Sequence, residues 1–155
     1  MAVTPPQEDL DTATFNGNLE AIEQHIAAGT DLNEKLGEDG HTALITATTL
    51  DHVDIVKALI TGGADINQRT NDGSTPLITA AFLCRQAVVE ALLDAGADKT
   101  LRSNAGTTAL ESVQAPWVFV KPIYEFLDNA LAPAGVSLDF ERIKADRPKI
   151  AQLLQ

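Results

Sequence analysis

The 155-residue sequence predicts an all-α fold, a solenoid of about four stacked helix-turn-helix repeats. Three segments share the pattern Gly-x-Thr-Ala/Pro-Leu with glycines 33 residues apart: Gly40–Leu44, Gly73–Leu77 and Gly106–Leu110. A second pattern recurs at intervals of 34 and 33 residues: Ala28–Asn33, Gly62–Asn67 and Ala95–Thr100. Aromatic residues make up only 5% of the chain, and this scarcity favours close-packed helices over a sheet.

Each repeat is predicted to hold two short helices. Thr42 and Thr75 stand where a first helix needs an N-cap, and Pro76 follows at a position where a missing N–H is harmless. The second helices are expected over 54–60 and 87–93, which are apolar at i, i+1, i+4 and i+5. A glycine after each second helix suits a left-handed C-terminal residue.

The spacing and residues resemble the ankyrin repeat family, whose signature is Thr-Pro-Leu-His-x-Ala in a unit of about 33 residues. Gly73–Ala81 followed by Val88–Asp98 is the best match. The chain is therefore predicted to form a single domain, 1–155, of four units and a cap: 8–37, 38–69, 70–102, 103–135 and a C-terminal helical cap over 136–155.

The fourth unit departs from the pattern after Gln114. Tyr124–Leu127 matches its second helix if about one residue is inserted. In the tail, Asp146 is expected to cap a last helix that Pro148 opens. Terminal units cover an open face of the core, so such departures are expected.

The formal charge of −11 disfavours nucleic acid and anionic membranes as partners. It has two interpretations: attraction of a basic protein partner, or solubility of a small domain. The chain has no run of about 18 apolar residues, and Met1–Pro6 has no signal-peptide pattern. We therefore expect a cytoplasmic protein. A signal peptide removed earlier would leave the periplasm or secretion open.

Candidate catalytic and metal-binding groups are few. His25, His41 and His52 lack the spacing of a helical metal site, and Cys84 is a lone cysteine expected to pack between helices. The carboxylates are scattered rather than paired for acid–base work. We expect no metal, no cofactor and no enzymatic activity.

The resemblance implies a concave binding face formed by loop tips and first helices. Its predicted tip residues are Glu38, Asp39, His41, Asn71, Asp72, Ser74, Asn104 and Thr107, flanked by Arg69 and Arg102. The ends of the first helices add Phe15, Asn16, Thr49, Leu50, Phe82 and Leu83, with Trp117 in the fourth unit.

Within this set, Phe15, Leu50, Phe82 and Leu83 occupy equivalent positions of successive repeats. They are predicted to form an apolar stripe along the groove, and exposed apolar clusters mark binding sites. The alternative is that the stripe packs beneath a tip or a terminal segment.

These observations predict a monomeric, non-enzymatic protein-binding module, an adaptor or regulator. The alternative is an immunity-type or inhibitor protein that occludes a basic toxin or enzyme. Because a fold does not specify a partner, the resemblance leaves the partner's identity open.

Overall fold

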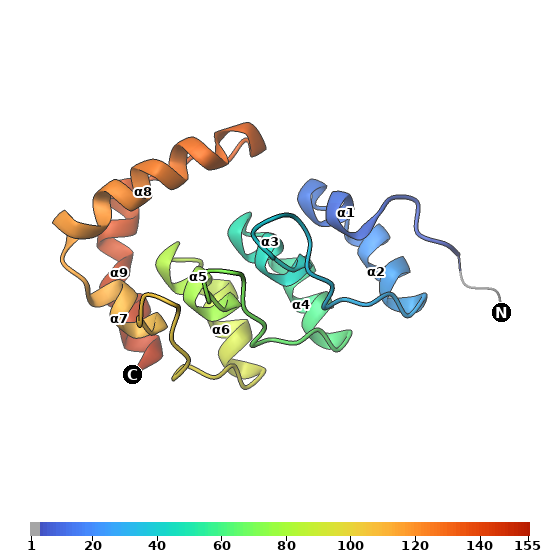
Figure 1. Cartoon of the computed structure of the whole chain (residues 1–155), viewed down its shortest axis with the longest axis horizontal. Coiled ribbons are helices and arrows are strands. Elements are labelled where there is room, and N and C mark those ends of the chain that lie inside the picture. The colour runs from blue at the N-terminus through green and yellow to red at the C-terminus, as the bar shows by residue number, and fades with distance from the viewer. Residues whose placement is uncertain (1–3) are drawn as a thin grey trace.

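The computed structural model describes residues 4–155, and its helices form a row of pairs along the long axis of the molecule (Figure 1). The first three pairs are α1 (Leu10–Asn16) with α2 (Leu19–Ala27), α3 (Ala43–Thr49) with α4 (Val53–Thr61), and α5 (Pro76–Phe82) with α6 (Gln86–Asp94). The remaining elements are α7 (Ala109–Gln114), α8 (Trp117–Leu131), the 3-10 turn η1 (Ala132–Ala134) and α9 (Phe140–Leu154). The predicted all-α repeat fold is confirmed.

Threonine caps set the start of α3, α5 and α7, whereas Asp9 caps α1. The hydroxyls of Thr42, Thr75 and Thr108 each accept a hydrogen bond from the amide three residues further on, at 3.4, 3.2 and 3.2 Å. Thr108 also forms a capping box with Glu111. These bonds satisfy amides that have no partner within the helix, which explains why the repeated threonine marks each start.

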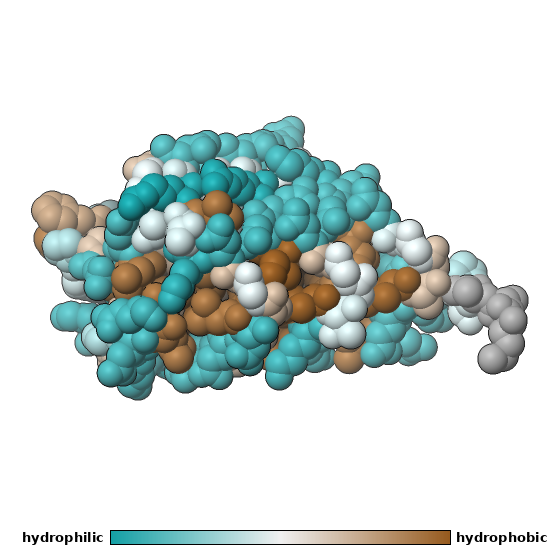
Figure 2. Space-filling view, turned by 90° about the horizontal axis from the view of Figure 1, so that it is seen from below, coloured by the Kyte–Doolittle hydropathy of each residue, from teal (hydrophilic) through white to brown (hydrophobic). Residues whose placement is uncertain are grey.

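The core runs continuously through the row. The first helices contact one another in succession, and so do the second helices. Leu44 and Leu77 of the first row and Leu59 and Leu92 of the second are at most 1% exposed, whereas Leu93, also expected in the core, is half-buried. Viewed from below, hydrophobic residues form a band along the long axis (Figure 2). Stability therefore depends on contacts between neighbouring pairs.

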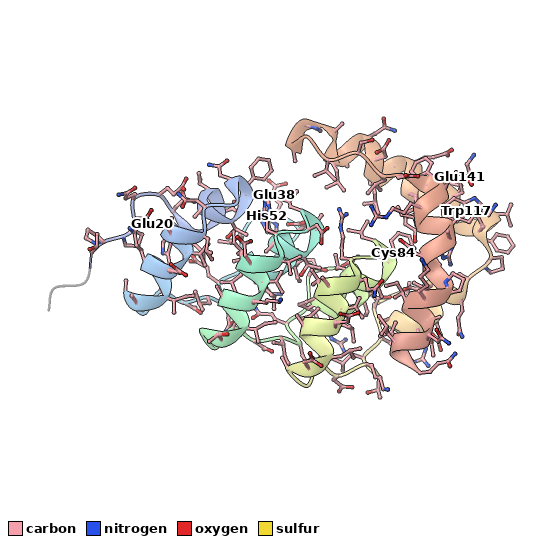
Figure 3. All side chains as sticks on the ribbon, turned by 180° about the vertical axis from the view of Figure 1, so that it is seen from behind. Glu20, Glu38, His52, Cys84, Trp117 and Glu141 are labelled. Atoms are coloured by element: carbon pink, nitrogen blue, oxygen red, sulfur yellow. The ribbon has the colours of Figure 1, made fainter. Side chains whose placement is uncertain are left out.

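The fourth pair is assembled differently from the others. The second helix packed against α7 is α9, which also contacts α6 and lies beside it when the molecule is seen from behind (Figure 3). The segment Tyr124–Leu127, expected as the second helix, belongs instead to α8. In the sequence, α8 is thus inserted between the two helices of the fourth pair. Helix α9 completes this pair and covers the C-terminal end of the stack.

Helix α9 begins earlier than predicted. Asp139 caps it by accepting a hydrogen bond from the amide of Arg142 at 3.0 Å, and Asp146 and Pro148 lie inside it. The earlier start buries Ile143 as well as Ile150 and so joins both halves of the helix to apolar clusters. That burial outweighs the backbone hydrogen bond lost at Pro148.

Arg147 ties α9 to the end of α7. Arg147 is 4% exposed, and its guanidinium donates to the carbonyl oxygens of Ser112, Val113 and Ala115 at 3.2, 3.2 and 2.6 Å. These carbonyls lie at the C-terminal end of α7, where a positive charge is favourable. The same guanidinium lies 5.8 Å from the ring centre of Trp117, at the start of α8. One buried cation therefore joins three helices.

Within residues 4–155, no helix has the length and apolar character needed to cross a membrane. The prediction made from Met1–Pro6 rests partly on residues 1–3, which lie outside the described residues.

Candidate partner-binding groove

Helix α8 extends over the first-helix side of the stack (Figure 1). The ring of Tyr124 stacks on that of Phe82, the last residue of α5, and the ring of Trp117 lies 5.4 Å from that of Tyr124. Leu83 and Val120 pack beside Tyr124 in a second apolar cluster, separate from the main core. These contacts attach the first half of α8 to the end of α5.

A groove lies between α8 and the first helices. It consists of two hollows of 770 and 460 Å³ that share Asp39, Ile45 and Thr49 in their linings. The larger lies between α3, α5, α7 and α8, and the smaller lies between α1, α3 and the segment from the end of α8 to η1. We call the two together the α8 groove. Each hollow by itself has a volume in the range of sites that hold a ligand or a few side chains of a partner.

The two sides of the α8 groove differ in chemistry. On its floor lie Ile45 and Ile78, and α8 supplies Ile123 and Leu127 as a wall. The loop tips that precede α3 and α5 contribute carboxylates instead, such as those of Asp39 and Asp72. Tyr124 contacts the opposite end of α5, so the acidic tips and the apolar helix border opposite sides of the groove.

Local hydrogen bonds hold the acidic side in its ionised form. Partial burial acts to raise the pKa of Asp72, but hydrogen bonds from Thr70 and Ser74 outweigh it, and the pKa lies below its ordinary value. The same balance lowers the pKa of Asp39, where hydrogen bonding and charge from His41 outweigh burial. The His41 ring is 2.5 Å from Asp39 and 3.4 Å from Asp11.

The predicted apolar stripe is only partly open. Phe15 is 50% exposed and, like the half-buried Leu50, lines the smaller hollow. Leu83 is 4% exposed, so its expected exposure is wrong, and Phe82 is half-buried beneath Tyr124. The reason is α8, whose aromatic and aliphatic side chains cover the C-terminal end of α5. Both residues therefore pack beneath α8, which is neither a tip nor the terminal segment of the alternative, and both still contribute to the lining of the larger hollow.

Two predicted tip residues link neighbouring repeats. The side-chain amide of Asn71 donates to the carbonyl of Glu38 at 2.8 Å, and that of Asn104 donates to the carbonyl of Asn71 at 2.9 Å. Their backbone amides donate to the preceding tip in parallel, to Asp39 and Asp72. The amide donors of these side chains are thus used to hold neighbouring tips in line. The sequence of one repeat does not reveal this role, because each acceptor belongs to the repeat before it.

The remaining predicted residues divide into two groups by position. Some line the α8 groove together with those above: His41, Thr49, Asn71, Asp72, Ser74 and Thr107. Others lie outside its lining: Asn16, Glu38, Arg69, Arg102, Asn104 and Trp117. Arg102 pairs with Glu111 at 2.8 Å, and the half-buried Trp117 packs between Tyr124 and Arg147.

Sequence reasoning missed the side chains that α8 contributes. Ile123 and Leu127 line the larger hollow, and Phe119 and Phe126 are exposed on the same helix. The spacing of Phe119, Ile123 and Phe126 was a usable helical signal. It was hidden because Pro122 suggests a break, but α8 continues through this proline and loses one backbone hydrogen bond there.

Cys84 packs as a structural residue. Burial, with a smaller contribution from the charge of Asp146, raises the pKa of its thiol to about 11. Its sulfur lies 3.7 Å from the carbonyl oxygen of Ile143, at the contact with α9 (Figure 3). A thiol with so high a pKa is a poor nucleophile at neutral pH. Over residues 4–155, no three His, Cys, Asp or Glu side chains are grouped to hold a metal ion.

Repeated helix pairs with threonine-capped first helices and a groove on one side define a helical-repeat protein of the interaction type. A family model of ankyrin repeats in three copies matches residues 10–103, and the chain belongs to the ankyrin repeat family. Ankyrin repeats are protein–protein interaction modules.

Two curated relatives share this repeat region. The chain is 40% identical over 68 residues to an ankyrin repeat and KH domain-containing protein of Caenorhabditis briggsae, and 36% identical over 72 residues to one of Caenorhabditis elegans. These matches cover 41% and 44% of the chain but only 2% and 3% of the relatives. The likeness therefore concerns the repeats and not the whole proteins.

Proposed function

We propose that this protein is a non-enzymatic adaptor or regulator that binds a partner protein through the α8 groove and the neighbouring loop tips. The observation that carries the proposal is the apolar α8 wall of the groove, where Ile123 is 48% exposed above the buried floor of Ile45 and Ile78 and opposite the acidic tips. Apolar surface that a folded chain leaves accessible in a concavity is typical of a binding site.

The partner we propose carries basic residues around an apolar centre. Asp11, Asp39 and Asp72 line the groove, and the formal charge of the chain is −11. Opposite charge speeds the encounter and selects among partners, while apolar burial supplies most of the affinity. We further propose that the chain binds as a monomer, because the groove is formed within a single copy.

The test compares one substitution at two positions. Thr79→Arg places a long cationic side chain in the larger hollow, where Thr79 is half-buried, and Thr61→Arg places it at the exposed end of α4. Immobilised wild-type chain and both variants are used to capture proteins from the source cell. We expect a partner retained by wild type and Thr61→Arg and lost from Thr79→Arg, with similar melting temperatures for all three.

A partner captured equally by Thr79→Arg would contradict the groove as the binding site. The captured material also separates an adaptor from the immunity-type alternative. An adaptor retains components of an assembly, whereas an inhibitor retains one enzyme or toxin and abolishes its activity when added to it.

A further inference from the structure

Helix α8 presents an apolar surface that nothing in residues 4–155 covers. Phe119, Ile123 and Phe126 are 73%, 48% and 70% exposed. Their spacings of four and three residues place them on one face of the helix, which we call the α8 ridge. Ile123 also lines the larger hollow, so the ridge continues the apolar wall of the groove outward to its edge. Exposed phenylalanines in such a row mark an interface.

The α8 wall of the groove, to which the ridge residue Ile123 belongs, and the loop tips border opposite sides of the groove, and Phe119 and Phe126 extend the apolar surface of α8 beyond the lining. Asp39 and Asp72 lie in the tips before α3 and α5, whereas α8 is anchored at Phe82, the last residue of α5. A bound segment therefore meets apolar side chains on one flank and carboxylates on the other. The matching segment has an apolar face and a basic flank beside it.

The walls of the groove indicate the conformation of that segment. Its floor and one wall are helices, whose backbone amides and carbonyls are paired internally apart from the ends. They offer no free strand edge for an extended chain to pair with. An extended segment would leave many backbone groups without partners in an apolar groove, whereas a helix satisfies its own.

We infer that the α8 groove receives one amphipathic helix of a partner. Apolar residues at i, i+3 or i+4 and i+7 contact the α8 ridge and the floor, and lysines or arginines along one flank face Asp39 and Asp72. This inference rests on the proposed function and specifies its partner by chemistry.

The probe is a fluorescent helical peptide of ~18 residues, about five turns, with a leucine stripe flanked by lysines. Three control peptides have glutamates in place of the lysines, a scrambled order that abolishes the helical period, or two central prolines. Binding to the full chain is measured by fluorescence anisotropy. We expect the lysine peptide to bind at least about 10-fold tighter than each control, and less tightly as salt increases.

Variants of the chain locate the bound peptide. Phe126→Ser and Phe119→Ser are each expected to lower the affinity of the chain for the lysine peptide about 10-fold, as substitution of an interface anchor does. Val118→Ser is the matched control, because Val118 is also 70% exposed on α8 but lies toward the Lys121–Glu125 ion pair. The affinity of Val118→Ser for the lysine peptide should equal that of wild type. Asp72→Asn should weaken binding and reduce its dependence on salt.

Equal binding of the proline or glutamate peptide, or equal loss from Val118→Ser and Phe126→Ser, would overturn the inference. So would failure of the lysine peptide to bind. The captured partner distinguishes this inference from the proposed function. If Thr79→Arg abolishes capture but the partner segment proves extended or acidic, the groove function stands and the helical, basic occupant is wrong.

Discussion

The rings of Tyr124 and Phe82 lie 4.3 Å apart and nearly parallel, and the Tyr124 hydroxyl donates to the carbonyl oxygen of Phe82 at 2.5 Å. The two residues are 42 positions apart in the chain. Tyr124 is completely buried although it belongs to the helix that carries the exposed α8 ridge. This contact, together with the apolar cluster around Tyr124, connects the inserted helix to the repeat stack.

Substitution of Tyr124 is expected to loosen α8. Tyr124→Phe keeps the ring and loses the hydrogen bond, at a cost of about 1 kcal/mol in the free energy of unfolding. Tyr124→Ala also removes the stacked ring and should cost about 3–5 kcal/mol. Urea denaturation measures both. Hydrogen exchange of Tyr124→Ala should increase in α8 but not in α1–α4, and uniform exchange throughout would show that α8 is integral to the core.

Arg147 should not tolerate replacement by lysine. Lysine keeps the charge but cannot reach the carbonyls of Ser112, Val113 and Ala115 at once, because it lacks the planar fork of the guanidinium. We expect Arg147→Lys to cost about 1.5–3 kcal/mol in thermal or urea unfolding.

Arg142→Lys on the same helix is the control, since that side chain is 80% exposed and, within residues 4–155, pairs with Asp146 alone. Its effect should lie within about 0.5 kcal/mol. Equal effects of the two substitutions would mean that the Arg147 hydrogen bonds add little to stability.

Two glycines at the same repeat position should respond differently to alanine. Gly73 and Gly106 have φ angles of 81° and 80°, so a side chain is strained at both by about 1–2 kcal/mol. A Cβ at Gly73 would also lie 2.7 Å from the backbone nitrogen of Asn104, whereas one at Gly106 would meet nothing within 4 Å. Gly73→Ala should therefore lower the melting temperature further. A larger loss from Gly106→Ala would refute the tip-to-tip contact.

The thiol of Cys84 should react slowly. Its pKa of about 11 exceeds the ordinary value of 9.0, so at pH 8 the thiolate population, and with it the alkylation rate, should fall roughly 100-fold below that of the unfolded chain. The raised pKa also makes the free energy of unfolding depend on pH. The thiol ionises at a lower pH in the unfolded chain than in the folded one, so stability that is fully present below pH 9 decreases as the pH rises toward 11. Iodoacetamide labelling of native and urea-unfolded protein checks the rate. Equal rates would show that Cys84 is not protected.

The lining of the proposed binding groove could be predicted only in part. Phe15, Leu50 and the tip carboxylates of Asp39 and Asp72 line the groove as expected from their repeat positions. The α8 ridge could not be found in this way, because the repeat pattern ends before it. Leu83 was misplaced for the same reason, since its exposure depends on a helix that begins at Trp117.

The repeated units were determined by the sequence alone. The threonine caps and the glycines that follow the second helices, at positions 29, 63 and 96, act within one or two turns of the chain, so their pattern specifies each helix pair without reference to distant residues. Their constant period also predicts that equivalent helices stack.

Only the tertiary structure decided which helix completes the fourth pair. Tyr124–Leu127 and the tail are both helical, and local preference does not distinguish them as partners of α7. Helix α9 takes that place because Ile150 and Leu154 enter the main core and Arg147 satisfies the carbonyls at the end of α7. Helix α8 is consequently left outside the stack, where Tyr124 anchors it and the α8 ridge remains exposed.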